Sequence, residues 1–107
     1  MDLRRQQRFP VRFQSVLSGP RHGEWTGTIS NLSRGGCLIE TEGQVFAGMH
    51  VSLSLEVPGE AAPLLIERAA VRWNRGRSVG VGFITVASPH KERLDQLLSQ
   101  LKLGSQV

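Results

Sequence analysis

The sequence Asn31-Leu32-Ser33-Arg34-Gly35-Gly36 is the stretch around which this chain of 107 residues is organised. It separates two segments with the composition of β-strands, residues 24–30 and 37–42, and the first of these is rich in Thr and Ile. Taken alone, a polar turn that ends in glycine only reverses the chain. A second polar stretch, Arg4-Arg5-Gln6-Gln7-Arg8, lies earlier and is too basic to be a core strand. Together the two stretches have the form RxxxR followed by NxSxxG.

Outside these stretches, apolar and polar residues alternate with the period of two that is typical of half-buried strands. The alternation is clearest in residues 51–57, and further strands are predicted over residues 9–18, 64–73 and 79–86. Within residues 64–73, one face is expected to carry Leu65, Ala69, Val71 and Trp73, and the other Arg68 and Arg72.

Near the C-terminus the period becomes that of a helix, with apolar residues at Leu94, Leu97, Leu98 and Leu101. Ser88 is expected to be the N-cap and Pro89 the first helical residue, so a helix is predicted over residues 89–103.

Six strands followed by one amphipathic helix predict an all-β fold, a six-stranded antiparallel barrel with a C-terminal α-helix packed on it. Residues 9–107 are expected to form this single domain, and residues 1–8 a flexible basic arm in front of it.

The net charge of +4 is concentrated in the first third of the chain. Residues 1–34 carry six arginines against two acidic side chains, whereas residues 35–107 carry seven basic and seven acidic side chains. The planar fork of Arg matches phosphate oxygens and the guanine edge better than the point charge of Lys does. This bias indicates an anionic partner of defined geometry.

Other classes of function find little support. The single Cys37 excludes an internal disulfide and a zinc ribbon, and the three histidines fall on separate elements, so no metal site is predicted. Ser33 has no adjacent base, so no catalytic residue or cofactor is expected and the chain is not predicted to be an enzyme. With no apolar run near eighteen residues and no signal peptide, it is expected to be cytoplasmic, without membrane insertion.

The two motifs, in this order, resemble the signature of the PilZ domain, a bacterial receptor for cyclic di-GMP. The run Val79-Gly80-Val81-Gly82-Phe83 adds to the resemblance, which covers essentially the whole chain. The resemblance implies a six-stranded barrel with a trailing helix, in agreement with the pattern above. Asn31 departs from the Asp that is commoner in the family, and it removes a carboxylate that would accept bonds from the N1–H and N2–H₂ groups of guanine.

The resemblance also implies the site residues. Arg4 and Arg8 would bind guanine or phosphate of cyclic di-GMP through their forks. Asn31 and Ser33 would contact the other base while stabilising their own turn. The remaining candidates are Arg5 as an extra contact or a solvated charge, Gly35 and Gly36 as positions of special dihedral or close approach, and Trp73 as a stacking face for guanine or a core or rim residue.

The function expected from these residues is a cyclic di-GMP receptor, with the ligand clamped between the arm and the turn. Because little of the chain precedes Arg4 or follows the helix, the signal is expected to pass in trans to a protein partner, and a homodimer is left open. One alternative is a PilZ-fold adaptor that binds a protein and ignores the nucleotide. Another is a small barrel that binds RNA or single-stranded DNA, but this class usually shows several exposed aromatic residues, so no polynucleotide partner is expected.

Overall fold

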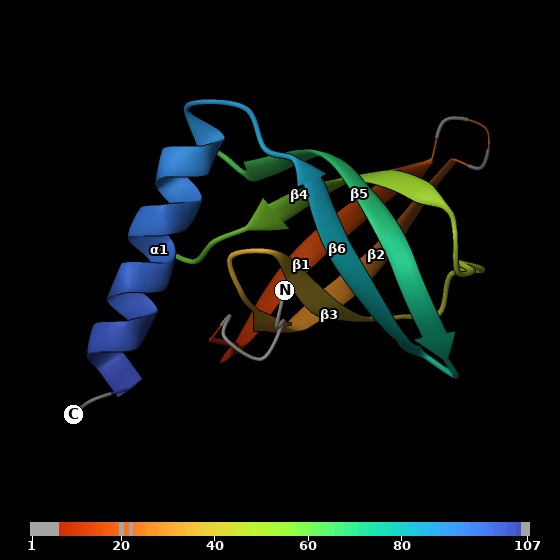
Figure 1. The fold of residues 1–107 in the computed structure, drawn as a ribbon, viewed down its shortest axis with the longest axis horizontal. Helices are drawn as coiled ribbons and strands as arrows, with labels where there is room; N and C mark the ends of the chain where they lie inside the picture. Colours follow the sequence, from red (N-terminus) through yellow and green to blue (C-terminus); the bar gives the residue numbers. More distant parts are fainter. Residues whose placement is uncertain (1–6, 20, 22, 106–107) are drawn as a thin grey trace.

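The computed structural model describes residues 7–19, 21 and 23–105 (Figure 1). Six strands precede one helix: β1 Phe9–Gly19, β2 Gly23–Leu32, β3 Gly36–Thr41, β4 His50–Glu56, β5 Leu64–Arg75, β6 Ser78–Thr85 and α1 His90–Ser105. All neighbouring strands are antiparallel, and they close into a barrel in the order β1-β2-β3-β6-β5-β4. The predicted fold class is therefore confirmed.

The barrel core is filled by the inward-facing half of each alternating strand. Closure pairs every strand on both sides, so the sheet has no exposed edge. Each fully buried aliphatic side chain contributes roughly 1.5–3 kcal/mol of hydrophobic stabilisation. The most deeply buried of these side chains are Leu17, Ile29, Leu32, Ile39, Leu53, Leu55, Leu64 and Ile66.

Strand β5 departs from simple alternation. Leu65 and Trp73 were predicted on one face together with Ala69 and Val71, but they are 44% and 45% exposed whereas Ala69 and Val71 are buried, so this part of the prediction is wrong. The register between β5 and β6 shifts between Arg68 and Ala69 and again between Val71 and Trp73. Each shift moves the following residues to the opposite face, because side chains alternate with a period of two. The buried positions of β5 are Leu64, Ile66, Ala69 and Val71.

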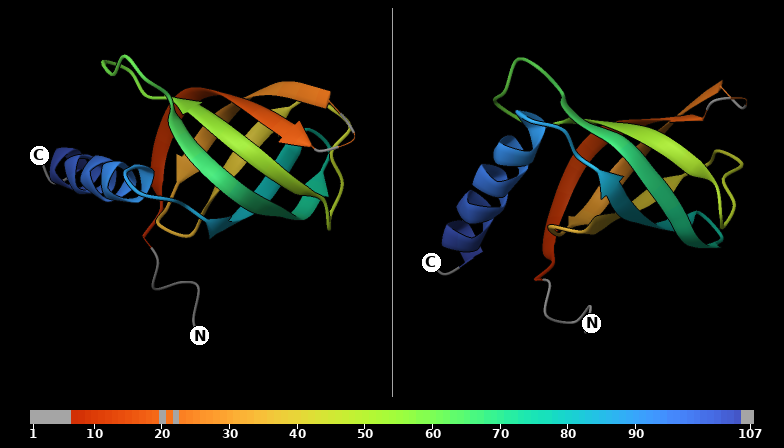
Figure 2. Two further views of the ribbon diagram at one scale, coloured as in Figure 1. Left: turned by 90° about the horizontal axis from the view of Figure 1, so that it is seen from above. Right: turned by 45° about the horizontal axis from the view of Figure 1, so that its top comes forward.

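Helix α1 lies at the barrel end that contains the start of β1 and the β2–β3 turn (Figures 1 and 2). Leu94 and Leu97 are buried against the core, and Leu98 and Leu101 are half-buried beside them. The helix begins at His90, one residue later than predicted. The predicted N-cap is wrong, since the Ser88 hydroxyl donates to the Glu92 carboxylate, at 3.1 Å, instead of accepting a hydrogen bond from a backbone N–H of the first helical turn.

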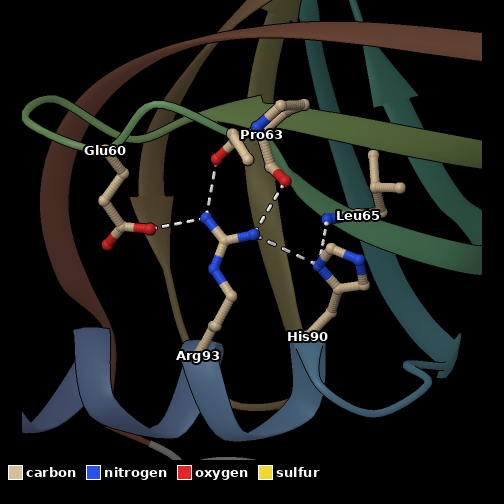
Figure 3. Close-up of polar contacts among 6 residues, drawn as sticks. Glu60, Pro63, Leu65, His90 and Arg93 are labelled. Carbon is tan, nitrogen blue, oxygen red and sulfur yellow. Dashed lines mark hydrogen bonds and ion pairs between the residues drawn. The ribbon is translucent and has the colours of Figure 1, made fainter.

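The first turns of α1 are fastened to the loop between β4 and β5 (Figure 3). The Arg93 guanidinium donates to the carbonyl oxygens of Ala62, at 2.7 Å, and Pro63, at 2.9 Å, and forms an ion pair with Glu60. His90 Nδ1 accepts a hydrogen bond from the Leu65 N–H at 3.2 Å. We call Glu60, Ala62, Pro63, His90 and Arg93 the helix anchor.

Candidate functional site

The turn between β2 and β3 is fixed both internally and to a neighbouring strand. The Ser33 N–H and its hydroxyl both donate to the Gly36 carbonyl oxygen, at 2.9 and 3.2 Å, and the side chain is 1% exposed. The Phe83 N–H of β6 donates to the Gly35 carbonyl oxygen at 2.8 Å. The expectation that Ser33 stabilises its own turn is confirmed. Its contact with a ligand stays a prediction.

Arg8 and Asn31 join the two sequence motifs in space. In the β1–β2 ladder Pro10 pairs with Asn31 and Phe9 with Leu32, so the residue before β1 lies beside the end of β2. The Arg8 Nη1 donates to Asn31 Oδ1 at 3.3 Å, across 23 residues of sequence. A shift in the β2–β3 register between Ile29 and Asn31 helps to place the Asn31 amide at this point.

Gly36 is required for close approach of two strands. Its φ is not in the left-handed region, where the described glycines are Gly23, Gly48, Gly59 and Gly76. A Cβ at Gly36 would instead collide with the carbonyl oxygen of Val81 in β6. Of the two roles considered from the sequence, close approach is therefore the one that the backbone requires.

Trp73 lies on the outer face of the barrel and covers Gly80 of β6. A Cβ at Gly80 would overlap the Trp73 indole, so the ring lies flat against this glycine. Gly80 pairs with Leu38 of β3, which in turn pairs with Asn31 of β2. Trp73 is thus on the same sheet surface as the candidate site, and stacking on guanine stays a prediction.

Arg72 is a neighbour of the site that the sequence pattern did not reveal. A Cβ at Gly82 would lie 2.6 Å from Arg72 Nε and 3.1 Å from Nη2, so the guanidinium covers Gly82. Gly82 is the β6 partner of Gly36. The alternation of strand β5 placed Arg72 and Trp73 on opposite faces, but the register shift beside them turns both side chains outward. The glycines at 80 and 82, which leave space above β6, were the available signal.

Cys37 lies in the core directly after the turn. Burial raises the pKa of its thiol to about 12, and the positive charge of Arg8 opposes this rise. The thiol therefore stays neutral and unreactive at physiological pH. Its interpretation as a small buried strand residue is confirmed.

Arg34 points from the turn toward the helix. Its Nε lies 3.5 Å from Asp95 Oδ1, and the two side chains are 69% and 44% exposed. Arg34 thus connects the candidate site with α1 through an exposed ion pair.

Two of the predicted site residues, Arg4 and Arg5, lie outside the described residues. Within residues 7–19, 21 and 23–105, no cluster of three or more His, Cys, Asp or Glu side chains could hold a metal ion. No helix in the same ranges is long and apolar enough to cross a membrane.

The fold described above is that of a known family. The model of the PilZ domain matches residues 2–100, so the chain belongs to the PilZ domain family. Among curated proteins, none matches the sequence.

Solved structures with the same fold include three relatives of low sequence identity. The inhibitor of motility from Bacillus subtilis, MotI/DgrA, has a TM-score of 0.78 and 21% identity, and covers 100% of this chain, which spans 55% of that protein. The PilZ domain of YcgR from Escherichia coli, solved with c-di-GMP, has a TM-score of 0.75 and 12% identity, with 98% and 95% of the two chains covered. The PilZ domain of CeSA from a cellulose-synthesizing bacterium has a TM-score of 0.65 and 19% identity, with 90% and 98% covered.

Proposed function

We propose that this chain is a receptor for cyclic di-GMP, which it binds between the N-terminal arm and the β2–β3 turn. The observation that carries the proposal is the hydrogen bond between Arg8 and Asn31, because it unites the two halves of the motif at one place. Membership of the PilZ family and the fold shared with the c-di-GMP complex of YcgR support it.

The chemistry of Arg8 suits an anionic purine ligand. The side chain is exposed, and a guanidinium has five N–H donors, of which the bond to Asn31 uses one. The remaining donors form a fork that pairs with a phosphate or with the O6 and N7 acceptors of guanine. We propose that Arg4 acts in the same way from the arm, with Arg5 as an additional contact.

Asn31 then has a defined part in recognition. Because its Oδ1 accepts the bond from Arg8, its amide N–H₂ group is left as a donor. A donor at this point matches the acceptor edge of guanine, whereas the carboxylate that is commoner in the family would match N1–H and N2–H₂. The presence of Asn31 in place of Asp therefore changes which guanine edge the turn binds, and nucleotide binding is retained.

The output of the receptor is a composite surface made of the arm, the ligand and the barrel. We propose that a separate protein recognises this surface, in the cytoplasm, and that the chain itself catalyses no reaction. Ordering of the arm costs roughly 1–2 kcal/mol of backbone entropy per residue, which several charge-assisted hydrogen bonds to the nucleotide offset.

Calorimetric titration with cyclic di-GMP tests the proposal. Arg8→Ala is expected to weaken binding by about tenfold or more, since it removes a bidentate contact. Arg21→Ala is the matched control, because it removes an equal charge from the β1–β2 turn at the opposite end of the barrel, and it is expected to bind as the wild type does.

Two results would contradict the proposal. Equal loss in the Arg8 and Arg21 variants would mean that only net charge matters, and a steep salt dependence together with oligonucleotide binding would point to a polynucleotide partner. Absence of heat with the wild type would leave a PilZ-fold adaptor that binds a protein alone.

A further inference from the structure

The outer surface of β5 and β6 carries a cation that the two sequence motifs do not include. The register shift between Val71 and Trp73 directs Arg72 outward, and its guanidinium lies over Gly82. Within the described ranges Arg72 makes no hydrogen bond or ion pair that would use its donors. The position of the Arg72 guanidinium is therefore set by the direction of the backbone and by the absence of a side chain at Gly82, and no protein acceptor holds it.

Arg72 and Arg8 lie two strands apart on the barrel. Strands β2, β3 and β6 are consecutive, and Asn31 of β2 is level with Leu38 of β3 and Gly80 of β6. Adjacent strands are about 4.8 Å apart, so the backbones of β2 and β6 are about 10 Å apart across β3, and Gly82 lies two residues further along β6 than Gly80.

The surface beside Arg72 is built on two paired glycines, Gly36 of β3 and Gly82 of β6, which we call the glycine floor. Gly36 is buried, and Gly82 is half-buried beneath the Arg72 guanidinium. On one side this glycine floor is bordered by the indole of Trp73, which is 45% exposed. An exposed indole next to an exposed arginine suits a planar base.

We propose that Arg72 is a specificity-determining residue that reads the O6 and N7 edge of one guanine of cyclic di-GMP. The inference rests on the proposed function, and it deepens that function by assigning the second base of the ligand. Cyclic di-GMP carries its phosphates in the central ring and its bases at the periphery. A cation two strands away from Arg8 is therefore placed for a base and not for the ring phosphates.

Titrations with cyclic di-GMP and with cyclic di-AMP separate base reading from charge. Arg pairs bidentately with guanine, whereas Gln pairs with adenine. Arg72→Gln is expected to weaken cyclic di-GMP binding by about tenfold or more and to shift the ratio of the two affinities toward cyclic di-AMP. Arg72→Lys keeps the charge without the fork, and it is expected to lose cyclic di-GMP affinity too.

Arg68→Gln is the matched control, since Arg68 is an exposed arginine on the same strand that pairs with Thr85, away from the glycine floor. It is expected to leave both affinities unchanged. Urea unfolding of all three variants is expected to match the wild type, as surface substitutions usually change stability little.

The titrations of the Arg72 and Arg8 variants test the role of Arg72 separately from nucleotide binding itself. Wild-type binding that survives Arg72→Gln but not Arg8→Ala would overturn the role of Arg72 alone. Unchanged affinity in Arg72→Lys would reduce Arg72 to a point charge and overturn base reading. A wild type that binds neither nucleotide would overturn both proposals.

Discussion

Two arginines, Arg93 in the helix anchor and Arg8 in the candidate site, show opposite uses of the same side chain. Arg93 is 23% exposed, and its guanidinium donates hydrogen bonds to two carbonyl oxygens and forms an ion pair with the Glu60 carboxylate. Arg8 is exposed and makes one bond, to Asn31, among the described residues. A guanidinium whose donors are satisfied by protein acceptors holds a structure together, whereas one with unused donors is available to a ligand.

The largest change in stability is expected from a substitution that breaks the helix anchor. Arg93→Ala removes three charge-assisted hydrogen bonds, and hydrogen bonds to charged groups contribute about 1.5–3 kcal/mol each, in part replaceable by water. We expect the free energy of unfolding to fall by about 3 kcal/mol, measured by urea denaturation. Nucleotide affinity of the folded fraction is expected to change much less.

Arg93→Lys sharpens the same comparison. A lysine keeps the charge opposite Glu60 but cannot span the Ala62 and Pro63 carbonyls in one plane, so it should recover only part of the lost stability. If Arg93→Ala instead abolished binding at full stability, the division between structural and ligand-binding arginines would be wrong.

The sequence predicted the barrel and the helix because each has a local signal, whereas the meeting of the two motifs was expected from the resemblance to the PilZ family. Strand period, helix period and turn residues are all properties of short segments. The same signals could not separate Arg93 from Arg8, since charge counting treats every arginine alike. The uneven charge pointed to the first third of the chain, whereas Arg93 and Arg72 both lie outside it, the first bonded to the β4–β5 loop and the second beside Gly82.

Strand β5 shows why the sequence could not predict the remaining features of the candidate site. Its register shifts depend on the pairing with β4 and β6, which no local pattern of residues 64–73 reports. A strict period of two therefore placed Trp73 on the same face as Val71 and Arg72 on the opposite face. The sequence offered two roles for Gly36 but could not choose between them, because the Val81 carbonyl that it approaches lies on a strand far along the chain.

A second prediction compares two glycines within the site. Gly36→Ala would press a methyl group against the backbone oxygen of Val81, which cannot move without shifting β6. We expect a loss of about 2 kcal/mol in the free energy of unfolding, in the range typical of overpacking. Gly82→Ala meets only the flexible Arg72 side chain, so urea denaturation should find its stability close to that of the wild type.

The two glycine variants also distinguish a position that is needed for stability, Gly36, from one that supports the binding surface, Gly82. Gly82→Ala is expected to displace the Arg72 guanidinium and to weaken cyclic di-GMP binding, although the fold is intact. Equal destabilisation by both substitutions would show that the outer surface of β6 is as tightly packed as its ladder with β3.

The smallest effect concerns the ion pair that connects the two regions. Arg34 belongs to the turn of the candidate site and Asp95 to the helix, and both side chains are largely in water at 3.5 Å separation. Exposed pairs of this kind contribute little, and a double-mutant cycle of Arg34→Ala and Asp95→Ala is expected to give a coupling below about 0.5 kcal/mol, weaker still at high salt. The helix anchor then holds α1 without help from the turn, so a ligand that draws Arg34 away from Asp95 would leave the helix docked. A coupling well above 1 kcal/mol, insensitive to salt, would instead show that the turn and the helix behave as one rigid unit, and that occupation of the site is felt by α1.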